Sequence, residues 1–333
     1  MKILIDPSKN QYRANLHCHT TVSDGRLTPE EVKQAYKSHG YSVVAFTDHD
    51  VMIPHHDLTD ADFVALTGFE TEINEISGGL KPTEDYPFRR QKCCHICMIA
   101  LDGNNDVQPL FNPDEYFVGK SGEYRHLVKY DPSKPPYVRK YSDIEKFMKE
   151  GSDSGFFVTY NHPCWSLQDY SDYMQYKSMH AMEISNYDCI KSGYNDYNPR
   201  VYDDILRGGT KIFAIGADDN HKENDMFGCY VKILADSLDY NSITKSLADG
   251  LFYAVTGDGG PDIYELSIDG LNVHVKCSPC ESIAVTTGIR RAYIQRGEDL
   301  TEATFEIHPE SNYFRLTLTD KNGRKADTNA CFI

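Results

Sequence analysis

The chain has 333 residues, of which 40% are hydrophobic, and a net charge of −16. This length exceeds one average domain, so we expect a large domain and a smaller one. The acidic balance argues against an extended nucleic-acid duplex as a partner. No apolar run is long enough for a transmembrane helix, and the N-terminus lacks the apolar core of a signal peptide, so we expect a cytoplasmic protein without membrane contact.

Strand and helix signals alternate along the first 250 residues. A helix is predicted over 28–40, where Thr28 is the N-cap, Glu31 completes a capping box and Gly40 ends the helix. Further helices are predicted over 141–151, 200–209 and 241–250, and strands over 12–19, 41–50, 63–73, 93–101, 156–163, 181–188, 211–221 and 229–237. This alternation predicts an α/β fold with a parallel sheet. About seven such units without a dinucleotide-binding glycine signature predict a closed or nearly closed barrel.

The pattern changes near Gly257. The residues that follow form short alternating runs separated by Gly, Asp, Asn and Pro, with no helix pattern between them. They predict a small antiparallel β-sandwich. We therefore expect a barrel over 1–256, with an irregular, proline-rich insertion at about 77–140, and a sandwich over 257–333. The sandwich is expected to carry no metal ligand, and the oligomeric state is left open.

Polar side chains recur where the predicted strands end. His17 and His19 lie one residue apart and Asp24 follows them, while Asp219 and His221 repeat the spacing near a later strand. Residues two apart in a strand point the same way, so the two histidines can hold one ion. The candidate ligands on this rim are His17, His19, Asp24, His49, Glu70, His95, His162, Asp219 and His221.

The mixture of imidazole and carboxylate indicates which ions would bind. It suits Zn²⁺, Mn²⁺ or Fe²⁺ better than Ca²⁺ or Mg²⁺. Nine ligands are too many for one tetrahedral ion, so we expect two or three divalent ions that share a bridging carboxylate. The ten cysteines are scattered, and those of CCHIC at 93–97 lie in an apolar, strand-like run, so we interpret them as core residues rather than as a zinc–thiolate site.

The motifs HCHTTVSDG, TDHD, GFETE, NHP and DDNH resemble, in this order, those of the PHP (polymerase and histidinol phosphatase) superfamily over about residues 12–225. The resemblance implies a distorted (β/α)₇ barrel with a trinuclear metal site. The tail from GLFYAVTG onward is similar to the β-sandwich of stand-alone PHP phosphoesterases and of related carbamate-ester hydrolases. It departs from them at its end, DTNACFI, where such tails commonly show a Trp and an Asn-Pro pair.

The resemblance also implies an assignment of ligands. One ion would be held by His17, His19, Glu70 and Asp219, a second by Glu70, His95 and His162, and a third by Asp24, His49 and His221. Glu70 would bridge two ions, which makes Glu70 and Asp219 candidate catalytic residues as well as ligands. Asp24 stands where some members carry His, and His95 follows a long insertion.

Two or three such ions would lower the pKa of a shared water to give hydroxide and offset charge on a transferring phosphoryl group. We therefore expect a hydrolase of phosphomonoesters such as nucleotides, or of phosphodiesters in short oligonucleotides. The alternative is hydrolysis of carboxylic or carbamate esters by the same site. A third interpretation is a non-catalytic metal-binding module.

Local charge predicts where a phosphate would bind. The segment 81–140 has a net charge of +2 in an acidic chain, which predicts a basic lid over the metals or, as the alternative, a solvated loop. Arg125 is the preferred phosphate-binding residue and Arg90 the second candidate, because a guanidinium can bind two phosphoryl oxygens at once. His126 is a candidate general acid.

Four further residues lie next to the proposed ligands. Glu183 and Asn186 end a predicted strand on the same rim, where they can bind and orient substrate or support a ligand. Asp48 and Asp50 flank His49 and can play the same part, with strand capping as the alternative.

Overall fold

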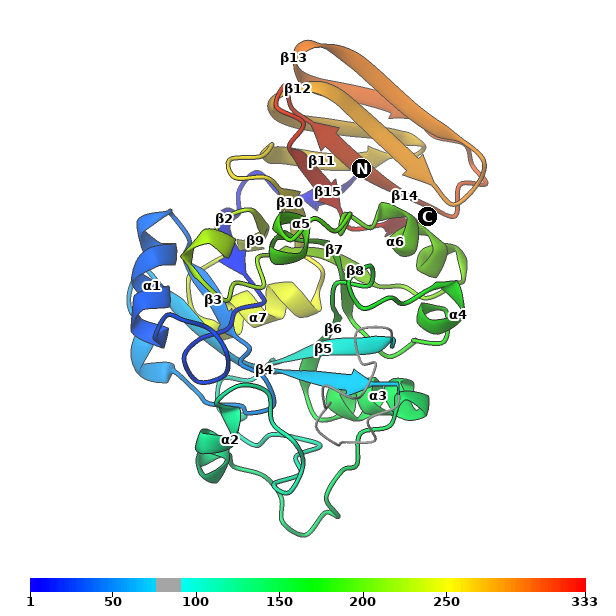
Figure 1. Ribbon diagram of the computed structural model, residues 1–333. Helices are drawn as coiled ribbons and strands as arrows, with labels where there is room; N and C mark the ends of the chain where they lie inside the picture. The colour runs from blue at the N-terminus through cyan, green and yellow to red at the C-terminus, as the bar shows by residue number, and fades with distance from the viewer. Residues whose placement is uncertain (76–90) are drawn as a thin grey trace.

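The computed structural model describes residues 1–75 and 91–333 (Figure 1). Arg90, one of the candidate phosphate-binding residues, lies outside the described residues. The helices are α1 (Pro29–Ser38), α2 (Ser121–Tyr124), α3 (Ile144–Asp153), α4 (Tyr170–Tyr173), α5 (Tyr187–Lys191), α6 (Pro199–Arg207) and α7 (Tyr240–Ala248), with 3₁₀ turns η1 (His56–Leu58), η3 (Arg125–Leu127), η4 (Tyr141–Asp143) and η5 (Glu223–Asp225). Within this part of the chain no helix is long and apolar enough to cross a membrane.

The strands fall into two sets along the chain. The first ten are β1 (Lys2–Ile5), β2 (Asn10–Asn15), β3 (Val43–Phe46), β4 (Val64–Asn74), β5 (Cys93–Ala100), β6 (Phe156–Tyr160), β7 (Ala181–Asn186), β8 (Phe213–Ala217), β9 (Cys229–Ala235) and β10 (Phe252–Thr256). The rest are β11 (Ile263–Asp269), β12 (Asn272–Thr287), β13 (Ala292–Glu306), β14 (Tyr313–Thr319), β15 (Lys325–Thr328) and β16 (Cys331–Phe332).

Helix α1 forms where the capping signal predicts it. The Thr28 hydroxyl accepts the Glu31 N–H at 3.2 Å, and the Glu31 carboxylate accepts the Thr28 N–H at 2.8 Å. Two otherwise unpaired donors at the helix start are thereby satisfied. The chain leaves the helix at Gly40, whose φ of +75° suits a residue without a Cβ.

The strand directions agree with the predicted parallel sheet only in part. Strands β2, β3 and β4 are parallel neighbours, and so are β6, β7 and β8. Strand β5 runs antiparallel to both β4 and β6, and β9 runs antiparallel to β2. The prediction of a parallel sheet throughout is therefore wrong at these two strands, because a buried apolar run reads the same in either direction.

The described strands belong to one sheet that is not closed. Its hydrogen-bonded path is β1-β11-β12-β14-β15-β10-β9-β2-β3-β4-β5-β6-β7-β8, and β8 is its last strand. The edge at β8 nevertheless approaches β9 and β10, because a Cβ on Gly216 would lie 2.9 Å from the Val255 carbonyl oxygen and 3.0 Å from that of Tyr230. The expected closed or nearly closed barrel is thus an open sheet whose edges come close without a ladder between them.

One apolar cluster lies among the strands whose ends carry the candidate ligands. It takes one side chain or more from each of β2 to β9, and Ile243 and Leu247 of α7 cover it: Ala14, Val43, Leu66, Ile99, Phe157, Ala181, Ile215 and Val231 are members. Burial of these side chains fixes the strands relative to one another. The loops that follow the strands are therefore held on a rigid support.

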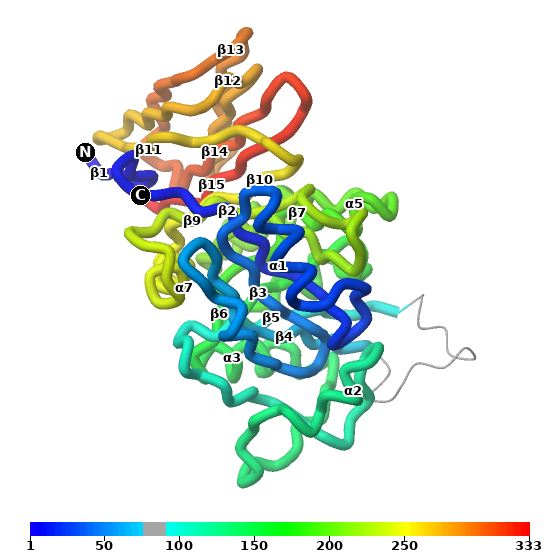
Figure 2. Tube along the Cα trace, turned by 90° about the vertical axis from the view of Figure 1, so that its left-hand side faces the viewer, coloured from blue at the N-terminus to red at the C-terminus, as the bar shows by residue number. Residues whose placement is uncertain are grey.

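The C-terminal strands continue the same sheet. Strand β10 pairs with β9 on one side and with β15 on the other, and the ladders among β11 to β16 are antiparallel as predicted. The short runs at 272–278 and 282–288 contribute to one long strand, β12, and those at 290–297 and 303–308 contribute to another, β13. The alternation continues through a bulge near Cys280. In Figures 1 and 2 these strands form a layer on one side of the molecule, with both termini beside it. N-terminal β1 pairs with β11, and the division at residue 257 stays our prediction.

A buried ion-pair network joins the C-terminal strands to helix α6. The Arg315 guanidinium on β14 donates from Nε and Nη2 to the two carboxylate oxygens of Asp203, at 2.8 and 2.9 Å. The same guanidinium donates to Asp327 on β15 at 3.3 Å. The Arg315 side chain is only 3% exposed, and it is the cation nearest to both carboxylates; Arg207 lies farther from Asp203, at 3.9 Å.

Replacement of Arg315 should therefore destabilise the protein strongly. We expect Arg315→Met to lower the free energy of unfolding by about 3–5 kcal/mol, because it removes the guanidinium that is hydrogen-bonded to both buried carboxylates and leaves Asp203 only the Arg207 guanidinium at 3.9 Å. The matched control is Lys276→Met on β12, which breaks an exposed pair with Glu265 and should cost about 1 kcal/mol or less. Denaturant unfolding measures both, and equal losses would contradict a structural role for the buried network.

Candidate metal centre

The first and last motifs are joined by backbone hydrogen bonds beyond the ends of β2 and β8. The His19 N–H donates to the Asn220 carbonyl at 3.1 Å, and the Asp219 N–H donates to the His17 carbonyl at 3.0 Å. The Asn15 side chain holds this junction by donating to the His17 carbonyl at 2.8 Å. The pair of histidines and the pair at 219 and 221 are therefore brought face to face.

Asp48 organises the loop that carries Asp24. Its carboxylate accepts the Thr20 N–H at 2.7 Å, the Thr20 hydroxyl at 2.8 Å and the Ser23 hydroxyl at 2.6 Å. Gly25 is required in the same loop, because a Cβ there would lie 2.6 Å from the carbonyl carbon of His19. These contacts turn Asp24 back toward the strand ends, so Asp48 supports a candidate ligand.

Three motif residues have left-handed backbone conformations. The φ angles are +68° at Asp50, +27° at His162 and +54° at Asp219. Such conformations cost about 1–3 kcal/mol each for residues with a Cβ and persist where the surroundings enforce them. At His162 the enforcing contact is its N–H, which donates to the Glu183 carboxylate at 2.9 Å. The motif segments are therefore held in fixed, unfavourable conformations.

All nine candidate ligands come together. They form four overlapping groups, in each of which one ligand atom per residue lies within 4.8 Å of the others: His19, Asp24, His49 and His221; His17, His19 and Glu70; His17, His162 and Asp219; His49, Glu70 and His95. The groups differ from the expected assignment, since His162 lies with His17 and Asp219 while His95 lies with His49. None of these groups contains a cysteine or a residue after His221.

Glu70 occupies the centre of the cluster. Its Oε1 lies 3.1 Å from His17 Nε2 and 3.2 Å from His95 Nδ1. Its Oε2 lies 3.2 Å from His49 Nδ1 and 3.3 Å from His19 Nε2. Both carboxylate oxygens thus face imidazole nitrogens from different segments: beyond β2, beyond β3 and on β5. This is the arrangement that a bridging ligand requires.

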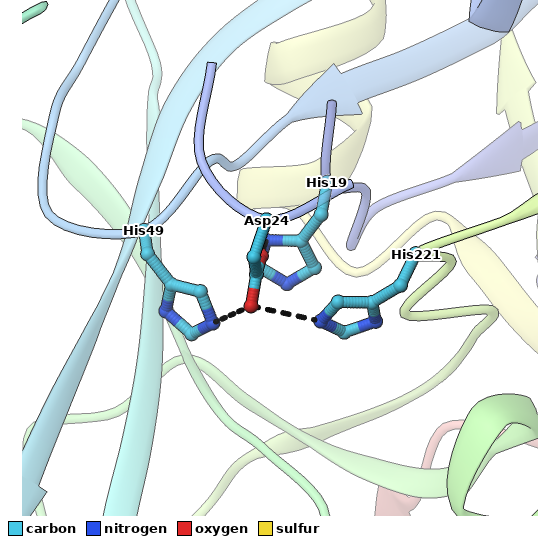
Figure 3. Close-up of side chains that lie close together, drawn as sticks. All are labelled: His19, Asp24, His49 and His221. Carbon is cyan, nitrogen blue, oxygen red and sulfur yellow. Dashed lines mark ion pairs between the residues drawn. The ribbon is translucent and has the colours of Figure 1, made fainter. Parts of the chain in front are cut away.

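The group around Asp24 lies at the open side of the site. Figure 3 shows the Asp24 carboxylate between two imidazoles that come from separate loops; Oδ2 lies 3.8 Å from His49 Nε2 and 3.6 Å from His221 Nε2. The side chains of Asp24 and His221 are 31% and 30% exposed, whereas Glu70 is 1% exposed. A substrate would therefore reach the cluster from this side.

Hydrogen bonds fix the orientation of three histidines. The Nδ1 atoms lie 2.7 Å from Glu183 Oε1 for His17, 3.2 Å from Ser166 Oγ for His162 and 2.9 Å from the Asp219 carbonyl for His221. An Nδ1–H that donates outward leaves the Nε2 lone pair facing the cluster, which is how metal-binding imidazoles are held.

Glu183 and Asn186 are both fully buried behind the cluster. Beyond its contact with His17, Glu183 accepts a hydrogen bond from Asn186 Nδ2 at 2.9 Å, and the same nitrogen lies 3.1 Å from Asp219 Oδ2. Of the two expected roles, support of ligands is the one these contacts favour. Direct contact of Glu183 and Asn186 with substrate stays a prediction.

Buried charges of opposite sign hold each other ionised. Burial raises the pKa of Glu70, but His17, His95 and His49 together hold that pKa well below its usual range. Burial lowers the pKa of His17, but Asp219 and Glu70 raise it well above its usual range. The carboxylates of Glu70 and Asp219 therefore need positive charge beside them. Either protons on the imidazoles or bound cations can provide it.

The residues fit a set of divalent ions. Among the described residues, buried His95 Nε2, His49 Nδ1 and Asp219 Oδ1 make no hydrogen bond. Buried polar atoms are uncommon in this state, and a bound ion is one of the reasons for it. These nitrogen and oxygen atoms are free to bind a metal. Together with the imidazoles and carboxylates of the nine side chains, they match the coordination preferences of Zn²⁺, Mn²⁺ and Fe²⁺.

The described lid candidates make contacts within their own segment. The Arg125 guanidinium donates to the carbonyls of Gly122 at 2.8 Å and Pro113 at 3.2 Å and lies over the Phe117 ring. His126 Nδ1 lies 2.9 Å from the Glu123 carbonyl, and its side chain is exposed. Neither belongs to the four metal groups, and their roles in substrate binding and proton transfer stay predictions.

Arg139, which contributes to the positive charge of the expected lid, is only 13% exposed and is held by two carboxylates. It pairs with Asp50 Oδ1 at 2.7 Å and Glu115 Oε2 at 3.2 Å. Asp50 also accepts the Val118 N–H at 2.7 Å. The insertion is thus fixed to the residue that follows His49, and the positive charge of Arg139 is used in this attachment.

Sequence reasoning missed the point at which the insertion touches the site. A Cβ on Gly119 would lie 2.5 Å from the Ser23 carbonyl oxygen and 2.8 Å from Asp24 Cβ, and the Lys120 N–H donates to the same carbonyl at 2.7 Å. No local pattern marks these residues, because their partners are about 100 positions away in the chain. Trp165, whose ring contacts His95 and His162, was also missed, although it follows His162 closely in the motif NHPCW.

Metal content should report the bridging position of Glu70. We expect at least two equivalents of divalent metal in the purified protein, and we expect Glu70→Ala to lose more than one equivalent because Glu70 belongs to two groups. His274→Ala, on a C-terminal strand, is the control and should keep all of its metal. Elemental analysis that finds one equivalent or less in the metal-replete parent would contradict a multinuclear site.

The contact between Gly119 and Asp24 can be tested with a matched pair of glycines. Gly119→Ala and Gly40→Ala both place a Cβ on a left-handed residue, with φ of +59° and +75°, but Gly40 has no atom within 4 Å of that position. Gly40→Ala should lose about 1 kcal/mol of stability from the left-handed conformation alone, and Gly119→Ala should lose more because its Cβ would also meet the Ser23 carbonyl oxygen at 2.5 Å. Only Gly119→Ala should also weaken metal binding at the Asp24 group, by roughly 10- to 100-fold. Equal metal affinities for the two variants would show that the insertion does not position Asp24.

Comparison with known proteins agrees with the resemblance. The PHP domain model matches residues 15–207, and among curated proteins none matches the chain. One similar solved structure is a two-domain protein from Bacteroides vulgatus containing a predicted PHP-like metal-dependent phosphoesterase, with 14% identity, coverage of 100% of this chain and 98% of that chain, and a TM-score of 0.43. A second, named as a metal-dependent phosphoesterase from Bifidobacterium adolescentis, has 14% identity, coverage of 72% and 96%, and a TM-score of 0.41.

A third similar structure is the lesion-specific endonuclease EndoQ from Pyrococcus furiosus, with 12% identity, coverage of 72% of this chain and 56% of that chain, and a TM-score of 0.37. At these identities and scores the structures add nothing about activity. The family model is the decisive finding, because it spans more than half of the chain and includes seven of the nine residues that the structure brings together. The chain belongs to the PHP domain family.

Proposed function

We propose that the protein is a multinuclear metal-dependent phosphoesterase that hydrolyses phosphomonoesters such as nucleotides, or phosphodiesters in short oligonucleotides. The observation that carries this proposal is the set of four overlapping donor groups, two of which share Glu70. A donor set of this size around one carboxylate is what a cluster of neighbouring ions requires. Two or three ions of Zn, Mn or Fe are the expected cofactors.

The protein residues have distinct parts in such a site. Bound divalent ions would supply Lewis acidity and lower the pKa of a coordinated water. His17, His162 and His221 present Nε2 inward because their Nδ1 atoms are held from behind. Glu70 and Asp219 would join the metal positions and keep them close together.

Basic residues near the open side favour a phosphate over a neutral ester. The Arg26 N–H donates to the His221 carbonyl at 2.8 Å, and the Lys120 N–H donates to the Ser23 carbonyl at 2.7 Å. Both side chains are exposed; Arg26 belongs to the segment that carries Asp24, and Lys120 belongs to the insertion at its contact with Ser23. They are therefore better placed than Arg125 to meet the outer oxygens of a phosphate that is bound at the cluster.

Hydrolysis of a carboxylic or carbamate ester by the same cluster is the second candidate function. It needs the same metal ligands but not the exposed Lys120 and Arg26, which together we call the basic rim. A neutral ester gains little from either side chain. A screen of the metal-loaded protein separates the two classes directly. It should include nucleotides, sugar phosphates, short oligonucleotides and neutral esters, with Glu70→Ala as the inactive control and His274→Ala as the active one.

The basic rim makes a kinetic prediction. On a phosphomonoester, Lys120→Ala or Arg26→Ala should lower kcat/KM roughly 30- to 1000-fold if the side chain contacts the transition state, which corresponds to about 2–4 kcal/mol. Arg125→Ala and His126→Ala test the lid on the same substrate, and Lys149→Ala on α3 is a control that should change nothing. If the four rim and lid variants all stay within about twofold at unchanged metal content, the phosphate assignment loses its support and the ester assignment gains.

A further inference from the structure

The chain has one tryptophan, and it lies at the metal cluster. The Trp165 ring centroid is 5.1 Å from that of His162 and 5.2 Å from that of His95, with interplanar angles of 83° and 73°. Trp165 is nevertheless 38% exposed. An indole is therefore in contact with two candidate ligands while more than a third of its surface remains in solvent.

The turn that carries Trp165 is held by several hydrogen bonds. The backbone N–H of Trp165 donates to the buried carboxylate of Asp196 at 3.1 Å. The Ser166 N–H donates to the His162 carbonyl at 3.1 Å, and the Ser166 carbonyl accepts the Cys93 N–H at 3.1 Å. The turn is thus tied to β5 and to the loop after α5, so the indole is presented in a fixed position.

Packing against the imidazoles explains only part of this arrangement. Interplanar angles of 73° and 83° mean that both imidazoles meet the indole edge to face and neither is stacked on it, while 38% of Trp165 stays open to solvent. Exposure of so large an apolar ring has a free-energy cost. The large aromatic side chains left most exposed in the described chain are Tyr130, Trp165, Tyr170, Tyr194 and Tyr264. Among these, Trp165 is the one with a ring contact to residues of the metal groups.

We propose that Trp165 is a stacking platform that selects phosphate esters carrying a planar aromatic group, such as a nucleobase, beside the reacting phosphate. The proposal rests on the proposed function and names its substrate class. Base–aromatic stacking tolerates any base because each has a π face. A phosphate held at the cluster would bring an attached nucleoside within reach of an indole that already touches His95 and His162.

The kinetic test compares two substrates that share a phosphate. On adenosine 5′-monophosphate, Trp165→Ala should lower kcat/KM roughly 5- to 150-fold, the range expected for loss of one base stack. On ribose 5-phosphate it should stay within about twofold. Trp165→Phe should recover most of the loss, and Tyr264→Ala, an exposed aromatic on β11, is the matched control. Metal content is measured for every variant.

Equal losses on both substrates, or metal loss in Trp165→Ala, would overturn the proposal and leave Trp165 as a residue that positions His95 and His162. Unchanged kinetics on both substrates would also overturn it.

A binding measurement keeps the proposal independent of turnover. Because Trp165 is the only tryptophan, its fluorescence reports on this place alone. Titration of the metal-loaded protein with adenosine 5′-monophosphate should quench the emission to saturation, while ribose 5-phosphate and inorganic phosphate should leave most of it. If the parent hydrolyses no phosphate ester, the proposed function fails, and this titration alone decides whether Trp165 is a stacking site. Selective quenching by adenosine 5′-monophosphate supports the stacking site. Absence of quenching overturns it.

Discussion

The burial of two carboxylates, those of Glu70 and Asp219, is the constraint on which the rest of the site depends. A carboxylate removed from water costs several kcal/mol unless positive charge lies beside it. His17 Nε2 lies 3.1 Å from Glu70 and from Asp219, and His19 Nε2 lies 3.0 Å from Asp219. Imidazole protons can meet the demand for charge, but they set imidazolium groups close together, and divalent ions would meet it without that repulsion.

The fold meets this constraint by bringing the ends of many strands to one place. The sheet is open between β8 and β9, yet the chain beyond β2 and β8 is joined by hydrogen bonds at His17, His19 and Asp219. Polar residues behind the cluster then hold the ligands: Glu183 on His17, Asp48 on the Asp24 loop and Asn161 on Glu70 at 2.9 Å. Left-handed backbone at His162 and Asp219 is the conformational cost of this arrangement.

Much of the site could be predicted from sequence because its information is local. His17 and His19 lie two residues apart at the end of a strand-like run, so their spacing alone predicts that both side chains point the same way. The buried network of Arg139 with Asp50, and the contact of Gly119 with Asp24, depend on which distant segments meet, so no local pattern revealed them. The direction of β5 was mispredicted because its residues are buried on both faces, and the continuity of β12 and β13 was hidden by the bulge near Cys280.

The measurement that tests the account most directly is anomalous diffraction from crystals of the metal-loaded protein, recorded on both sides of the absorption edge of the bound metal. The account predicts at least two anomalous peaks, about 3.5–4 Å apart, on either side of the Glu70 carboxylate and within reach of the four donor groups. A single peak, or peaks that avoid Glu70, would contradict it.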